Sequence, residues 1–125
     1  MLEMSSKEFP QEGDIWMVKF KKLKEFSKPF RPCMVVSNNL QNEFDKNIVV
    51  VGITTDEMEK IRTFEVFIDN IPETGLDYPS KICCNYLHTA NKKLRLIGTK
   101  RIGIVDPETM AKVKEAFKIT LNLGK

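Results

Sequence analysis

The chain has 125 residues, of which 42% are hydrophobic and 30% are charged, and its formal net charge is +3. This length and apolar fraction suit one globular domain with a sizeable core and exclude two ordinary domains. No apolar run is long enough to span a bilayer, and residues 1–12 lack the apolar segment of a secretory signal, so we expect a cytoplasmic protein with no membrane partner. We expect residues 1–12 to form a flexible leader and residues 13–125 a single domain.

Short strands account for most of the predicted structure. Gly13-Asp14 opens the first, over residues 15–20, in which Trp16, Val18 and Phe20 alternate toward one face. The lysine-rich segment that follows ends at Pro29-Phe30-Arg31-Pro32, where two close prolines argue against a central strand and predict a loop or an open hairpin arm. Later apolar runs predict strands at residues 33–37, 48–53, 64–68, 81–87 and 100–105, with a helical turn between residues 38 and 46.

The last predicted element is an amphipathic helix. Asp106 is a natural N-cap, Pro107 suits the first helical position, Glu108 complements the helix dipole, and Gly124 is expected to end the helix. Its apolar stripe consists of Met110, Val113, Ala116, Phe117 and Leu121. Strands followed by one covering helix predict an α+β, mainly β fold: a small, strongly bent antiparallel sheet or SH3-like barrel with the C-terminal helix packed on it.

The three cysteines bear on cofactors and oxidation. Their number is odd, and the adjacent Cys83 and Cys84 have a geometry that rarely forms a disulfide. A zinc site would have to combine these thiols and Cys33 with His88, but the chain has no CxxC pair, and adjacent strand residues point to opposite faces. We therefore expect three thiols in or near the core, and neither a metal nor another cofactor.

Basic residues gather in two segments. Residues 19–31 hold six cations and a single acid, and residues 92–101 hold five cations and no acid. Segregated basic loops of this kind are what a nucleic-acid backbone requires, although charge runs also occur in loops that are merely solvated. The lysines of the first loop are Lys21, Lys22, Lys24 and Lys28.

Arg31 stands at the start of a predicted buried strand, and Thr54 and Thr55 follow the end of a neighbouring one. Arginine keeps its charge at any working pH, and its planar fork of donors fits a phosphate. A threonine at the adjacent strand end can share that phosphate. The pair therefore points to phosphodiester chemistry or phosphate binding without a metal, and the competing interpretation is a surface arginine that caps a strand.

The order and spacing of several short motifs resemble the MazF/PemK family of toxin endoribonucleases. These motifs are Gly13-Asp14-Ile15-Trp16, Arg31-Pro32, Val35-Val36-Ser37-Asn38, Val51-Gly52-Ile53-Thr54, residues 82–89 and the helix at residues 106–116. The likeness covers roughly residues 12–123. It implies a CcdB/PemK-like fold, a homodimer, and a cognate antitoxin protein whose complex with the toxin binds DNA. It also implies metal-independent, sequence-specific cleavage of single-stranded RNA through attack of the ribose 2′-hydroxyl on the adjacent phosphorus.

The resemblance also implies roles for individual residues. Arg31 and Thr54 fall on the family's catalytic positions, with Thr55, Asn85 and His88 as candidates for catalytic support. Lys21, Lys22, Lys24 and Lys28 become candidate RNA-binding residues.

The sequence departs from the family pattern at three places. The segment 20–30 is rich in lysine where many relatives have glycine. The positions of an acid and an arginine in some relatives correspond to Asn85 and Cys83. The arginine that the family commonly has shortly before a threonine is replaced here by His88. This histidine would either transfer protons near neutral pH or be structural.

Two other functions remain open on the sequence. One is a toxin-fold module that binds RNA or a protein without cutting, as the missing acid and the changed loop allow. The other is a CcdB-like poison of DNA gyrase, against which the pairing of Arg31 with Thr54 argues.

Overall fold

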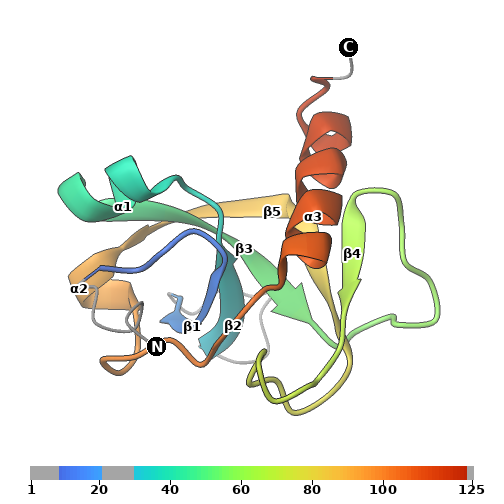
Figure 1. Cartoon of the computed structure of the whole chain (residues 1–125), viewed down its shortest axis with the longest axis horizontal. Helices are drawn as coiled ribbons and strands as arrows, with labels where there is room; N and C mark the ends of the chain where they lie inside the picture. The colour runs from blue at the N-terminus through green and yellow to red at the C-terminus, as the bar shows by residue number, and fades with distance from the viewer. Residues whose placement is uncertain (1–8, 21–29, 124–125) are drawn as a thin grey trace.

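One bent antiparallel sheet of six strands forms the frame of the molecule (Figure 1). The structure, a computed structural model, describes residues 9–20 and 30–123. Neighbouring strands follow the order β4-β5-β3-β2-β1-β6. The strands are β1 (Asp14–Lys19), β2 (Phe30–Val35), β3 (Asn47–Thr54), β4 (Glu65–Ile68), β5 (Ser80–Asn91) and β6 (Gly103–Ile104). The helices in these ranges are α1 (Asn39–Phe44), α2 (Lys92–Arg95) and α3 (Pro107–Thr120).

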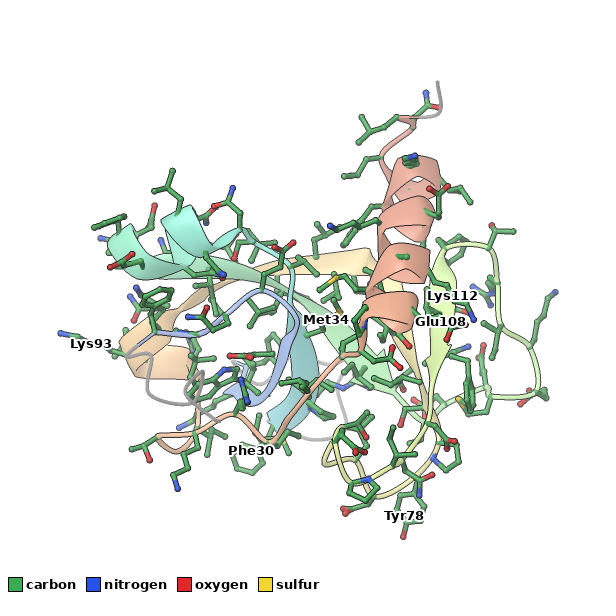
Figure 2. The ribbon with its side chains drawn as sticks, viewed as in Figure 1. Phe30, Met34, Tyr78, Lys93, Glu108 and Lys112 are labelled. Atoms are coloured by element: carbon green, nitrogen blue, oxygen red, sulfur yellow. The ribbon has the colours of Figure 1, made fainter. Side chains whose placement is uncertain are left out.

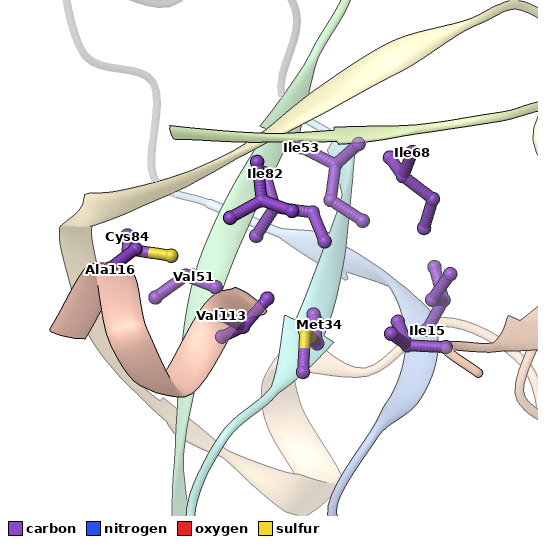
Figure 3. Packing of buried hydrophobic residues seen from close by; sticks show 11 residues of the cluster. Ile15, Met34, Val51, Ile53, Ile68, Ile82, Cys84, Val113 and Ala116 are labelled. Atoms are coloured by element: carbon purple, nitrogen blue, oxygen red, sulfur yellow. The ribbon is translucent and has the colours of Figure 1, made fainter. Parts of the chain in front are cut away.

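Side chains that alternate along the central strands pack into two apolar clusters, one on each face of the sheet. Met34, Val51 and Ile82 belong to the first cluster, which also contains Val113 and Ala116 of α3 (Figure 3). The second cluster holds Trp16, Val18, Cys33, Val35, Ile48, Val50 and Ala90. Because successive residues of a strand point to opposite faces, β2 supplies side chains to both clusters. Helix α3 stands beside β4 and β5 and covers the first face only (Figure 1).

The predicted C-terminal helix is present with its expected N-cap. The Asp106 side chain accepts a hydrogen bond from the Thr109 backbone N–H at 2.7 Å, and Pro107 begins the helix. Four residues of the predicted stripe, Met110, Val113, Ala116 and Phe117, pack on or against the first cluster. Leu121, the fifth, is 49% exposed because the helix ends at Thr120 after rising away from the sheet, so this part of the prediction is wrong (Figure 1). Gly124 lies outside the described residues.

Strand β2 begins earlier than the prolines suggested. It includes Pro32, which pairs with Met17 of β1, whereas pairing with β3 starts only at Cys33. Pro32 therefore has a strand neighbour on one side only, as a residue without a backbone N–H requires. Of the two structures predicted for this segment, the described residues 30–32 form the open hairpin arm.

Strand β5 is longer than predicted and carries a bulge. Val51 of β3 pairs with Leu87, yet the next residue, Gly52, pairs with Cys83, so residues 84–86 of β5 have no partner in β3. The strand then continues to Asn91, whose side chain accepts from the backbone N–H groups of Lys93 and Leu94 and starts the short helix α2. The sequence did not predict α2. No helix within the described ranges combines the length and apolar character that crossing a membrane requires.

Candidate functional site

Arg31 and Thr54 come together where the β2–β3 ladder opens. Cys33 pairs with Gly52 in antiparallel register, so the residue two before Cys33 lies level with the residue two after Gly52. Both side chains belong to the alternation that forms the second cluster, on the face that α3 leaves uncovered. They line a pocket of about 210 Å³ whose lining includes Arg31, Pro32, Thr54, Thr55, Asp56 and Ser80.

The hydroxyl of Thr54 is held from two sides. Its Oγ1 accepts a hydrogen bond from Arg31 Nη2 at 3.4 Å and another from the Asp56 backbone N–H at 3.0 Å. A threonine hydroxyl has two acceptor lone pairs and one proton. With both lone pairs engaged, the proton is left to be donated to a ligand in the pocket. The geometry thus presents a permanent cation and an oriented O–H donor together, a combination that suits a phosphate oxygen.

Lys81 anchors the loop between β3 and β4, which lies beside this pocket. It is the β5 partner of Thr54 and is only 3% exposed. Its ammonium forms an ion pair with Glu65 Oε1 at 3.1 Å and donates to the backbone carbonyls of Glu57 at 3.0 Å and Lys60 at 3.1 Å. One buried charge on β5 therefore holds both β4 and the connection between β3 and β4. The sequence analysis missed this residue, although a lysine between Ser80 and the apolar Ile82 was a visible signal.

The predicted supporting residues divide into two groups. Thr55 lines the Arg31 pocket, as does Asp56, which the sequence analysis did not single out. Asn85 lies exposed in the β5 bulge, outside the lining of that pocket. His88 lines a different pocket of about 180 Å³, where its ring centroid lies 4.9 Å from that of Phe20. The predicted RNA-binding residues Lys21, Lys22, Lys24 and Lys28 lie outside the described residues.

Burial controls the titration of the groups around the site. It lowers the pKa of His88, and the nearby charge of Arg31 lowers that pKa further, so the imidazole is neutral at physiological pH. Burial likewise raises the pKa of Cys33 to about 12, against a smaller opposing effect of Arg31, and that of Cys83 to about 11. These thiols stay protonated and are not nucleophiles.

The expectation of three core thiols is confirmed, since Cys33, Cys83 and Cys84 are all buried and free. In the ranges that the structure describes, no group of three or more histidine, cysteine or acidic side chains is placed to hold a metal ion.

The small bent sheet therefore carries an arginine and a threonine together in one pocket, on the face that its covering helix leaves open. In a comparison with protein families, residues 11–121 match the PemK-like, MazF-like toxin of type II toxin–antitoxin systems, and the chain belongs to this family. It is 33% identical over 93 residues to the endoribonuclease EndoA of Bacillus subtilis, a match that spans 74% of this chain and 77% of EndoA. The family expected from the sequence is thereby confirmed.

Solved structures show the same fold. An endoribonuclease in complex with its cognate antitoxin from a mycobacterial species superposes with a TM-score of 0.71 at 24% identity, covering 91% of this chain and 96% of that one. MazE–MazF from Deinococcus radiodurans gives a TM-score of 0.68 at 14% identity, covering 92% and 97%. The predicted α+β, mainly β architecture with a C-terminal helix is confirmed by these matches and by the sheet described above.

Proposed function

We propose that this protein is the toxin endoribonuclease of a type II toxin–antitoxin pair and that it cleaves single-stranded RNA, at short sequence motifs and without a metal, by attack of the ribose 2′-hydroxyl. The observation that carries the proposal is the contact of Arg31 Nη2 with Thr54 Oγ1 at 3.4 Å inside a pocket. The homology to an endoribonuclease supports the reaction class.

The chemistry follows from the two side chains. A scissile phosphate in the pocket meets the Arg31 guanidinium and the Thr54 hydroxyl. As the 2′-oxygen bonds to phosphorus, negative charge grows on the non-bridging oxygens, where fixed donors stabilise the transition state more than the ground state. The bond from phosphorus to the 5′-oxygen then breaks, and that oxygen takes a proton from water, which leaves a 2′,3′-cyclic phosphate and a 5′-hydroxyl end. Arg31 is a stabiliser of charge and not a proton acceptor, since its pKa lies far above neutrality.

The proton of the 2′-hydroxyl needs an acceptor. Asp56 is an acidic residue in the lining of the pocket, and its backbone N–H donates to the Thr54 hydroxyl. We assign the acceptor role to this carboxylate. If so, the cleavage rate of wild type should fall toward low pH and that of Asp56→Asn should not, and an unchanged pH–rate profile in the variant would transfer the role to water.

Cleavage in the presence of EDTA tests the proposal. Purified protein is incubated with a long RNA, and the 5′ ends and the cyclic phosphates of the products are mapped. Arg31→Ala should cut at least about a hundredfold more slowly, the loss typical of removing one main donor to a developing oxyanion. Lys112→Ala, which removes a cation from α3 on the opposite face, is the matched control and should cut normally (Figure 2).

Three results would contradict the assignment. Arg31→Ala activity equal to wild type would remove Arg31 from the chemistry. A wild type that binds RNA but leaves it intact would favour the alternative of a binding module on the toxin fold. A wild type that inhibits gyrase and spares RNA would favour the CcdB-like alternative.

The partners of the protein are also part of the proposal. Two of the solved relatives contain an antitoxin, and we assign this chain a cognate antitoxin as well. The basic loop that contains Lys21, Lys22 and Lys24 is proposed to hold RNA on sequence grounds. Replacing these three lysines with glutamine should lower the salt slope of RNA binding by up to about two, since each single-strand phosphate contact contributes about 0.7. An unchanged slope would leave the loop as a solvated surface.

A further inference from the structure

A second pocket of about 180 Å³ lies on the same face of the sheet as Arg31 and Thr54. Val18, which lines it, is the direct ladder partner of Arg31, so the two pockets share one pair of strands. The charge of Arg31 also acts on His88 in the wall of this pocket, which shows that the two groups are electrostatic neighbours. The two pockets therefore lie next to each other along β1 and β2.

The second pocket has an apolar floor and an aromatic wall. Val18 and Ala90, which are 0% and 2% exposed, line its base. Phe20 and His88 form the wall, with their ring planes inclined at 58°. A neutral imidazole is itself a flat aromatic ring that carries one N–H donor and one acceptor nitrogen. This is the composition that recognises a flat heteroaromatic ring with a polar edge.

A cation is held at the rim of the same pocket. Arg95 lines it from the short helix α2. The residue that follows, Leu96, forms an antiparallel bridge with Val18 and packs against the second apolar cluster. This bridge fixes the end of α2 against β1, so Arg95 is placed at the rim by the fold. Lys93 on the same helix projects away from the body of the molecule (Figure 2).

The dimensions and chemistry of the pocket limit the classes of ligand that it can bind. Its volume is well below the roughly 300 Å³ at which pockets for drug-sized molecules begin, and it suits a single ring system. One histidine without a nearby carboxylate or thiol in the lining is not a metal site. An aromatic wall beside a guanidinium fits a base joined to a phosphate.

We infer that this second pocket is a nucleotide subsite: it binds the base of one nucleotide beside the cleaved bond against Phe20 and His88, and a backbone phosphate of the same strand at Arg95. The inference rests on the proposed RNA cleavage at Arg31 and names where the neighbouring nucleotide sits. It assigns to Phe20, His88 and Arg95 a role in substrate choice, separate from the chemistry.

The test combines protein variants with modified RNA. A cleavage site is first mapped with wild type, and short RNAs are made with a 2′-deoxyribose at the cut position, so that they bind without reacting. Abasic nucleotides are then placed one at a time on either side of that position, and affinity is measured by fluorescence anisotropy. For wild type, one of these abasic positions should weaken binding about tenfold, the effect of losing one base–aromatic stack.

The variants decide whether that base sits in the second pocket. In Phe20→Leu, which keeps an apolar side chain and removes the ring, the abasic penalty at that position should fall to about onefold, while the other positions keep theirs. Arg95→Gln should lower the salt slope by about 0.7, and Lys93→Gln, its matched control on the same helix, should leave the slope unchanged.

The possible failures are distinguishable. A wild type that cleaves no RNA overturns the proposed function and the subsite with it. A wild type that cleaves, with abasic penalties identical in Phe20→Leu at every position, overturns the subsite alone. Equal salt slopes for Arg95→Gln and Lys93→Gln would show that Arg95 does not bind a backbone phosphate.

Discussion

Two donors occupy the lone pairs of the Thr54 hydroxyl and so orient its proton, and substitutions of this one residue test whether that proton matters. Removing the hydroxyl while keeping the shape, as in Thr54→Val, should lower the cleavage rate about a hundredfold, because the transition state then loses an oriented donor. Thr54→Ser keeps the hydroxyl and its two donors and should stay within a fewfold of wild type. Single-turnover cleavage of one RNA under saturating protein measures both. Equal activity of Thr54→Val and wild type would show that Arg31 acts alone.

Because of His88, the free energy of unfolding of the protein depends on pH. The folded pKa is lowered from 6.5, mainly by burial and then by Arg31, so between the folded pKa and 6.5 the unfolded state binds more protons than the folded state. The stabilising contribution is complete above 6.5 and is lost as the pH falls through the folded pKa. Denaturant unfolding at a series of pH values should therefore show a steeper loss of unfolding free energy below 6.5 for wild type than for His88→Gln. Parallel curves would mean that His88 is equally free to charge in both states.

Among the elements, the connection between β3 and β4 depends on one buried ammonium. Lys81→Met keeps the length of the side chain but leaves Glu65 buried without its partner, which should cost about 3–5 kcal/mol of unfolding free energy. Adding Glu65→Leu removes the unpaired charge and should restore most of that stability. Cleavage by the double variant should nevertheless stay at least about tenfold below wild type, because the carbonyls of Glu57 and Lys60 have lost their donor and the loop beside Thr54 is no longer held.

Denaturant unfolding and cleavage rates of the single and double variants check this together. Recovery of both stability and activity in the double variant would make Lys81 a purely structural residue. Loss of activity with stability restored would make it a residue that positions the pocket.

The same elements show how far sequence reasoning reached. Alternating apolar residues located the strands, and the capping residues Asp106 and Pro107 located α3, because both signals act over a few neighbouring residues. The pairing of Arg31 with Thr54 was predicted from their places at the ends of neighbouring strands, the family resemblance added the catalytic roles, and the register of β2 with β3 gives the contact its geometry. A lysine beside apolar residues was visible at position 81, but its role as an anchor could not be predicted, since its acceptors are backbone carbonyls 24 and 21 residues away. Helix α2 is too short to show any periodicity.

For the molecule as a whole, we expect a homodimer. The edge strand β4 pairs with β5 on one side only within the described part of the sheet, and its Phe67 is 46% exposed. Ile119 in the last turn of the adjoining helix α3, and Leu121 and Leu123 just after it, are 54%, 49% and 59% exposed. A sheet edge flanked by exposed apolar side chains is a surface that proteins ordinarily cover, and a two-fold contact covers the same patch on both copies.

Light scattering at micromolar concentration should therefore report twice the chain mass of 14.4 kDa. The double variant Phe67→Glu/Ile119→Glu places charges on both parts of the proposed interface and should shift the mass to that of one chain, because a buried unpaired carboxylate is costly. Phe44→Glu, at a 75% exposed position on α1 at the other end of the sheet, is the matched control and should remain dimeric (Figure 1). A wild-type mass of 14.4 kDa would refute the dimer. Dissociation by Phe44→Glu alone would move the interface to α1 and leave the β4 edge to the antitoxin.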